Sequence, residues 1–146
     1  MFILREGEAR TTMMYCGLAS SLTAGAVGVF DVSTSTAVSP VIDATSSLLG
    51  CNLAGVVYKT PAATDYYVEV QLVDPTQIWE YDCTSNTADA QLGKLNDLTD
   101  SATVANSTTI STATTAFVRN IRAVGAAADK KMLGIIVGSG SPKALS

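Results

Sequence analysis

The chain has 146 residues, of which 47% are hydrophobic and 15% charged, and its formal net charge is −4. This length fits one domain, and the hydrophobic content excludes a disordered chain as the default. The negative charge, and the lack of any basic run with interleaved aromatic residues, argue against a nucleic-acid partner. An average soluble domain has about 25% charged residues. A chain with so few charges is either poorly soluble or buries its weakly polar surface against other subunits. The second possibility indicates that the protein assembles with other chains.

Histidine is absent from the chain. This absence removes Ser-His-Asp hydrolases, Cys-His hydrolases and His-ligated metal sites together, so we expect no enzyme, no cofactor and no metal. The three cysteines, Cys16, Cys51 and Cys83, form no CxxC pair. Their odd number predicts small buried hydrophobes rather than a disulfide framework. The sequence leaves open whether Cys51 and Cys83 meet.

Residues 1–60 show little regular period and are predicted to form an extended, irregular N-terminal arm region. Three stretches within it favour short strands, namely VGVFDV at 27–32, SPVID at 39–43 and LAGVVYK at 53–59. The apolar run at 17–30 could be mistaken for part of a signal peptide. The residues before it carry two Arg and two Glu, and the run is too short to span a bilayer. We expect a chain made in the cytoplasm, without a membrane partner.

The stretch YYVEVQLVDPTQIWEYDC, residues 66–83, alternates with period two on both sides of turn residues 74–77. This pattern predicts an antiparallel hairpin. Its apolar face would pair Leu72 with Trp79, Val70 with Tyr81 and Val68 with Cys83.

The other face of this hairpin would place Glu69 opposite Asp82 and Gln71 opposite Glu80. Facing carboxylates would lie about 5 Å apart at Cβ, which is also about the spacing in a retaining glycosidase. A flat two-stranded face supplies no cleft, no raised pKa and no substrate-binding groups. We therefore expect a solvated or partner-facing side of a sheet. A glycan hydrolase that uses Glu69, Glu80 and Asp82 is kept as an alternative.

After the hairpin the sequence predicts short elements joined by turns. They are a helical turn or strand entry at 87–93, a strand and turn at 95–106, a strand at 117–124, a turn at 125–131 and a strand buried on both faces at 131–137. The Thr-rich run at 107–115 is predicted as an exposed loop or an edge, and GSGSPKALS as a flexible tail.

Several motifs in the second half carry little functional signal. Asp89, Asp97 and Asp100 lack the spacing of an EF-hand and are predicted to form Asx turns. The sequon at Asn106 has no secretion signal to make it usable. GSGSP opens no helix and lacks the lysine of a phosphate loop.

Charge is distributed unevenly along the chain. Residues 31–100 hold ten acids against Lys59 and Lys94, whereas residues 119–146 hold five bases against Asp129. These regions either pair within one fold or fix the orientation of neighbouring copies.

The order of VEVQLVDPTQIWEYDC, ADAQLGKLNDLTDSATVAN, FVRNIRAV and DKKMLGIIV resembles the head decoration, or cement, proteins of tailed bacteriophages. The resemblance covers residues 56–138 and rests on pattern without a diagnostic motif. The fold expected is all-β, a small β-barrel or β-tulip-like domain over residues 61–146 behind the N-terminal arm of residues 1–60. A single domain over 1–146 is the other option.

The resemblance implies a non-enzymatic virion protein on the outer surface of an icosahedral head, often a homotrimer, with the major capsid protein as partner. It also implies an extended arm on neighbouring capsid subunits, so removing residues 2–10 is expected to release the protein while the barrel stays folded. The long Ala/Gly/Ser-rich half up to residue 60 departs from the family pattern and leaves the trimer open. The candidate contact residues are Met1, Phe2, Ile3, Leu4, Arg5, Arg10, Arg119, Arg122, Lys130 and Lys131.

A carbohydrate- or receptor-binding module of a phage fibre or tail is the remaining alternative. It would use surface aromatic residues, for which Tyr66, Tyr67 and Trp79 are the candidates. Glycan binding by the isolated chain would support this alternative.

Overall fold

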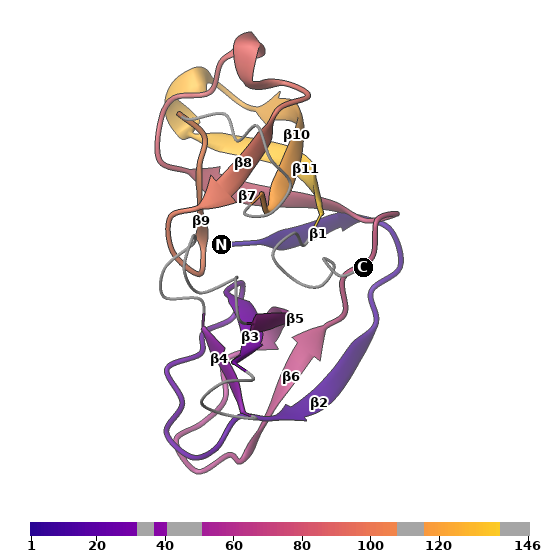
Figure 1. Ribbon diagram of the computed structural model, residues 1–146, viewed down its shortest axis with the longest axis vertical. Helices are drawn as coiled ribbons and strands as arrows, with labels where there is room; N and C mark the ends of the chain where they lie inside the picture. The colour runs from indigo at the N-terminus through magenta and orange to yellow at the C-terminus, as the bar shows by residue number, and fades with distance from the viewer. Residues whose placement is uncertain (32–36, 41–50, 108–115, 138–146) are drawn as a thin grey trace.

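A computed structural model describes residues 1–31, 37–40, 51–107 and 116–137 of the chain (Figure 1). These residues form two β-sheets, and the helical elements among them are two three-residue 3-10 turns, η1 (Asp89–Gln91) and η2 (Ala127–Asp129). The all-β fold class expected from the sequence is confirmed. The Thr-rich segment 108–115 and the tail 138–146 lie outside the described residues.

The first sheet is a barrel-like ring that is partly closed (Figure 1). Its strand order is β1 (Ile3–Glu6), β7 (Ile78–Cys83), β11 (Lys131–Ile136), β10 (Val118–Val124), β8 (Leu95–Leu98) and β9 (Thr103–Ala105). The end of β7 also pairs in parallel with β9, and this pairing partly closes the ring. Strand β11 lies between β7 and β10 and covers all but the last residue of the strand predicted at 131–137. Its successive residues Met132, Leu133 and Gly134 are buried, as expected for a strand buried on both faces.

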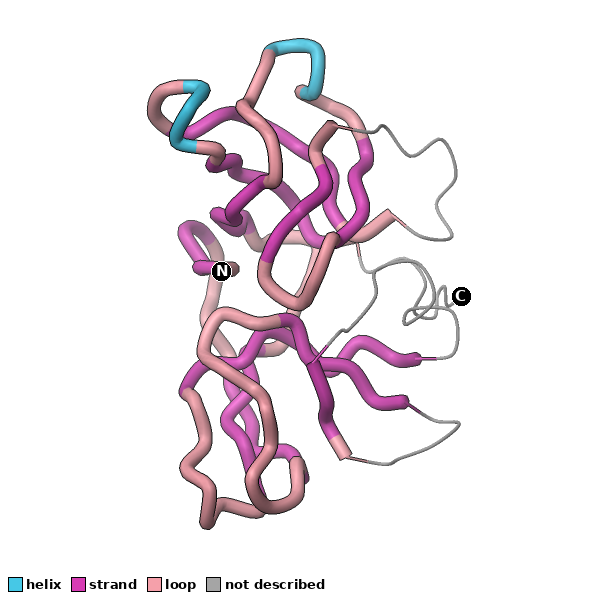
Figure 2. The backbone as a smooth tube through the Cα atoms, turned by 90° about the vertical axis from the view of Figure 1, so that its left-hand side faces the viewer, coloured by secondary structure: helices cyan, strands magenta, loops and turns pink. Residues whose placement is uncertain are grey.

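The second sheet is open and has five strands, with β2 and β4 at its edges. Its order is β2 (Thr11–Tyr15), β6 (Tyr67–Gln71), β5 (Cys51–Lys59), β3 (Val27–Asp31) and β4 (Val38–Pro40). All its pairings are antiparallel. Figures 1 and 2 show this sheet below the ring.

One apolar core joins the two sheets. The ring contributes Trp79, Tyr81 and Phe117, and the open sheet contributes valines of β3 and β5. Phe2 lies in this core, with its ring centroid 5.4 Å from that of Tyr81 and 5.7 Å from that of Phe117. Burying one such side chain contributes about 1.5–3 kcal/mol. A backbone hydrogen bond from Val27 N to Ser101 O, 2.6 Å long, also crosses between the sheets.

The predicted hairpin of residues 66–83 is wrong, because β6 and β7 lie in different sheets. The turn at Pro75 and Thr76 forms as expected, but a strand has only two edges for hydrogen bonding, and both edges of each strand are taken by others. β6 lies between β2 and β5. On β7, Trp79 faces Leu4 and Gly134 instead of Leu72.

The N-terminal region predicted to be irregular carries five strands within its described residues. β1 joins the ring and β2 to β5 belong to the open sheet. The chain passes between the sheets at residues 7–10 and 72–77, so both sheets take strands from residues 1–60. The strands expected at VGVFDV, LAGVVYK and FVRNIRAV are confirmed as β3, β5 and β10. β4 covers the first two residues of SPVID, and the last three lie outside the described residues.

Candidate interaction surfaces

The apolar candidates at the N-terminus are packed within the chain. Phe2 is 2% exposed, and Leu4 packs against the same core. Ile3 is half-buried and faces Glu80 in the β1–β7 ladder. These three side chains therefore hold β1 on the ring.

Several of the charged candidates meet on one side of the ring. Asp82 accepts a hydrogen bond from the Met1 α-ammonium at 2.8 Å and another from Lys131 Nζ at 2.5 Å. Arg5 Nε donates to Glu80 Oε1 at 2.9 Å. The structure thus brings together Met1, Arg5 and Lys131, which are far apart in sequence, and pairs each of them with an acid of β7.

These contacts shift the protonation of the ion pair. Burial raises the pKa of Asp82, but the hydrogen bonds from Lys131 and the α-ammonium outweigh it and leave the pKa below its ordinary value. The hydrogen bond to Asp82 raises the pKa of Lys131. Both groups are therefore held in their charged forms at neutral pH.

The remaining basic candidates lie apart from this cluster. Arg119 Nη1 donates to Gly93 O at 2.8 Å, and Lys130 is exposed with a left-handed φ of 56° after η2. Arg122 is exposed and lines an open groove of about 400 Å³ with Arg5 and Glu80. Within the described part of the chain, neither Arg122 nor Lys130 forms an ion pair.

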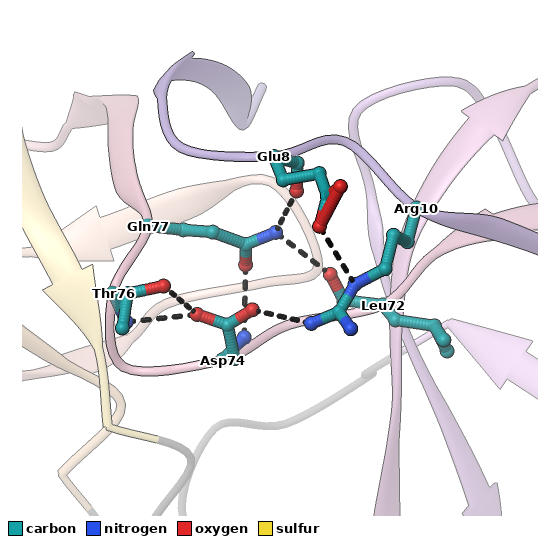
Figure 3. A network of polar contacts seen from close by, with 6 residues as sticks. All are labelled: Glu8, Arg10, Leu72, Asp74, Thr76 and Gln77. Atoms are coloured by element: carbon teal, nitrogen blue, oxygen red, sulfur yellow. Dashed lines mark hydrogen bonds and ion pairs between the residues drawn. The ribbon is translucent and has the colours of Figure 1, made fainter.

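Arg10 belongs to a polar network that joins the two connections between the sheets (Figure 3). Its Nη2 donates to Asp74 Oδ2 at 2.9 Å. Asp74 Oδ1 accepts from Thr76 N at 2.8 Å and from the Thr76 hydroxyl, and these bonds lower the pKa of Asp74. This is the Asx turn expected where a chain reverses.

Gln77 is the centre of this network (Figure 3). Its fully buried side-chain Nε2 donates to Glu8 O at 3.0 Å and to Leu72 O at 3.1 Å, and its Oε1 accepts from Asp74 N at 2.8 Å. One amide thus ties segment 7–10 to segment 72–77. The sequence indicated only turn material at this position.

The carboxylate pair considered for a glycan hydrolase does not form. Glu69 lies on the open sheet, where it accepts from the Thr11 hydroxyl at 2.8 Å and faces Lys59. Asp82 lies on the ring and faces Lys131. The expected pairing of Glu69 with Asp82 is wrong because it depended on the predicted hairpin. Glu80 and Asp82 share one strand and each contacts a cation.

The aromatic candidates for glycan binding separate into exposed and buried residues. Trp79 has 0% exposure, so it cannot contact a ligand at the surface. Tyr66 and Tyr67 are exposed on the open sheet, with Tyr67 at 55%. Tyr67 faces Tyr15 in the β2–β6 ladder, and their rings meet edge to face at 5.9 Å.

These tyrosines belong to a larger exposed apolar group that the sequence did not indicate. We name it the open-sheet patch and define it by Met13, Tyr15 and Tyr67, which are all exposed. The rings of Tyr15 and Tyr67 touch, and Met13 and Tyr67 line one hollow. Met13 is the most exposed of them, at 59%. The alternation of β2 was the signal that could have found it, but TTMMY is short and lies in a region without clear period. Next to the patch is a hollow of about 170 Å³, lined by Met13, Lys59, Asp65, Tyr67 and Glu69, among others.

The remaining sequence candidates have structural roles. Cys16 and Cys83 are buried free thiols, as predicted; the side chain of Cys51 lies outside the described residues. Burial, and then the charge of Asp82, raise the pKa of Cys83 to about 12. Asp100 Oδ1 accepts from Ala102 N in an Asx turn, as predicted. Asn106 of the sequon is buried and donates to Ser85 O.

Comparison with known proteins finds no matching family model, no matching curated relative and no matching solved structure. Among the described residues, no helix has the length and hydropathy needed to cross a membrane. The same residues contain no group of three or more potential metal-ligating side chains.

Proposed function

We propose that this chain is a structural virion protein, a decoration or cement protein that binds the outer surface of an icosahedral phage head and stabilises it by bridging capsomers. The observation that carries this proposal is the open-sheet patch, where large apolar side chains stay exposed beside an edge of the sheet that no other described strand covers. Exposed apolar groups of this kind mark interaction surfaces. Tyrosine and methionine are enriched at protein interfaces.

The low charge of the chain supports the same function. Only 15% of its residues are charged. Much of its surface is therefore weakly hydrated and loses little hydration free energy when a partner covers it. A cement protein needs only weak individual contacts, because bridging several subunits raises avidity by about 10² to 10⁴. The partners of this chain would be the major capsid protein and further copies of itself, in a homotrimer or other homo-oligomer on the virion surface.

The separation of the carboxylates supports a non-enzymatic role. Glu69, Glu80 and Asp82 each contact a cation or a hydroxyl, and Glu69 is on a different sheet from the other two. A general acid would need a raised pKa beside an ionised partner, but the pKa of Asp82 is lowered. Substituting each acid by alanine tests this point, since loss of polysaccharide turnover would instead favour the hydrolase.

The test of shell binding must leave the core intact. Deleting residues 2–10 would remove Phe2 from between Tyr81 and Phe117, so loss of binding would not be separable from loss of folding. Substituting Tyr15 and Tyr67 by serine changes only exposed side chains. We expect the double variant to melt close to the unaltered chain and to co-sediment less with heads of the phage that encodes it. Full occupancy of this variant on the heads would remove the patch as the contact surface.

A carbohydrate-binding module is the second candidate, favoured by the hollow beside Tyr67. An exposed tyrosine ring next to Asp65 and Glu69 offers an apolar face and acceptors for hydroxyl groups. A glycan array probed with the full chain would support this candidate if a saccharide bound and Tyr67→Ala abolished the binding.

A further inference from the structure

Strand β2 is an edge strand of the open sheet. It pairs with β6 on one side, and no strand of the described chain lies on its other side (Figure 1). Five successive residues, Thr11 to Tyr15, pair with β6 without a bulge. The pairing of β2 is therefore regular over its whole length.

The hydrogen bonds at the two ends of β2 identify the backbone groups that face away from β6. Arg10 O accepts from Leu72 N at 2.8 Å, and Cys16 N donates to Tyr66 O at 2.8 Å. Residues of an antiparallel strand alternate between facing the partner and facing away. Residues 12 and 14 thus face β6 like residues 10 and 16, and the N–H and C=O groups of Thr11, Met13 and Tyr15 point outward.

This edge has none of the usual features that prevent pairing with another chain. Natural edge strands are protected by Lys, Pro, bulges or very short length. β2 contains no charged residue and no proline, whereas the opposite edge, β4, is three residues long and includes Pro40. Among the described residues no strand pairs with the outward groups of β2, so these groups can accept an added strand.

The charge next to β2 indicates which kind of chain would fit. The hollow beside β2 is lined by two acids, Asp65 and Glu69, and one base, Lys59. Tyr15 and Tyr67 are exposed on the same sheet. Net negative charge and aromatic faces both attract a cationic side chain.

We propose that β2 accepts an extended, basic segment of a partner protein as a sixth strand of the open sheet. Main-chain hydrogen bonds to Thr11, Met13 and Tyr15 would provide affinity, and alternate Lys or Arg side chains would lie over the tyrosines and Glu69. That the partner is the shell protein rests on the proposed function. The addition of a strand to β2 does not depend on the proposed function, and the experiments below test the two proposals separately.

The experiment uses the full chain, labelled for NMR, and two short peptides in which valine alternates with either lysine or glutamate. Amide exchange at Thr11, Met13 and Tyr15 is expected to slow with the lysine peptide alone, and added salt should weaken the effect. No protection at saturating lysine peptide, or equal binding of the glutamate peptide, would overturn the proposal. Protection without peptide that rises with protein concentration would identify a second copy as the occupant and overturn it as well.

Met13→Pro is the sharpest variant, because it removes an outward N–H without touching the ladder to β6. We expect peptide binding about tenfold weaker, whereas Met13→Thr, which keeps the N–H, should bind nearly as the unaltered chain does. If Met13→Pro fails to fold, Glu69→Gln replaces it, with an expected loss of about threefold and a smaller salt dependence. Unchanged binding in Met13→Pro would contradict strand addition, and unchanged binding in Glu69→Gln would contradict the basic side chains assigned to the partner.

Binding of the chain to heads of the phage to which the proposed function assigns it distinguishes the two proposals. If the peptide binds and the heads do not, the proposed function fails while strand acceptance stands. If the heads bind Met13→Pro as well as the unaltered chain, the shell is not the β2 partner.

Discussion

Lys131 and Asp82 face each other across the β7–β11 ladder, with Lys131 Nζ 2.5 Å from Asp82 Oδ1. Asp82 also accepts from the α-ammonium of Met1, so one carboxylate holds two elements of the ring together. Both side chains are partly exposed, so we expect the Lys131 ion pair to contribute less than about 1 kcal/mol.

This ion pair predicts a pH dependence of stability. The pKa of Asp82 is lowered by folding, so its contribution is present above its unfolded pKa of about 3.9 and is lost as the pH falls through the folded value. Urea unfolding at neutral and acidic pH should show a smaller acid loss for Asp82→Asn than for the unaltered chain. Asp89→Asn, at an exposed position, is the control. Equal acid sensitivity of the chain and Asp82→Asn would refute the assignment.

Gln77→Ala is expected to destabilise the chain by about 2–3 kcal/mol. The substitution leaves Asp74 N without its acceptor, and Glu8 O and Leu72 O without a donor, at a buried position. Gln77→Glu keeps the acceptor but buries a charge, so it should cost more. Denaturant unfolding measures both. A cost below about 0.5 kcal/mol for Gln77→Ala, as for an ordinary surface change, would mean that the network of Figure 3 does not tie the sheets together.

Phe2→Ala should cost about 3–5 kcal/mol, the usual range for a large-to-small change in a core. Its ring packs against Tyr81 and Phe117. Met13→Ala, at an exposed position on β2, is the matched control and should be close to neutral. Thermal unfolding of both variants checks this, and equal melting temperatures would show that the N-terminal segment is a free arm.

Two glycines provide a matched test of the ring. A Cβ at Gly134 would lie 2.5 Å from Arg119 O, against the backbone of β10, whereas a Cβ at Gly93 would meet nothing within 4 Å. Gly134→Ala should therefore cost about 2–3 kcal/mol through overpacking. Gly93→Ala should cost only about 1–2 kcal/mol, for its positive φ. Equal costs in denaturant unfolding would contradict the β10–β11 packing.

Cys83 is expected to be unreactive in the folded chain. Burial and the nearby charge of Asp82 raise its pKa to about 12, and the thiolate is the reactive form. Alkylation followed by peptide mass spectrometry at mildly alkaline pH should label Cys83 only after denaturation. Rapid labelling of Cys83 in the native chain would show that the ring opens at this strand.

The sequence predicts strands well where alternation is long, and their partners poorly. The alternation of residues 78–83 correctly indicates that Trp79, Tyr81 and Cys83 face the core. The same alternation is expected whichever strands lie next to residues 78–83. It therefore could not show that β7 pairs with β1, β9 and β11.

Partners depend instead on contacts between distant residues. Gln77, which ties the β6–β7 connection to Glu8, resembles turn material in the sequence. Likewise, the open-sheet patch lies partly on β2, whose five residues are too few for a clear period.

The proposal that this chain is a phage head decoration protein is tested most directly by electron cryomicroscopy of the heads of the phage to which the proposal assigns it, imaged with and without the added protein. We expect density for the chain at symmetry-related sites on the outer surface, bridging neighbouring capsomers, and heads that survive higher temperature when it is present. Bare heads at saturating protein, with the chain monomeric in solution, would contradict the account.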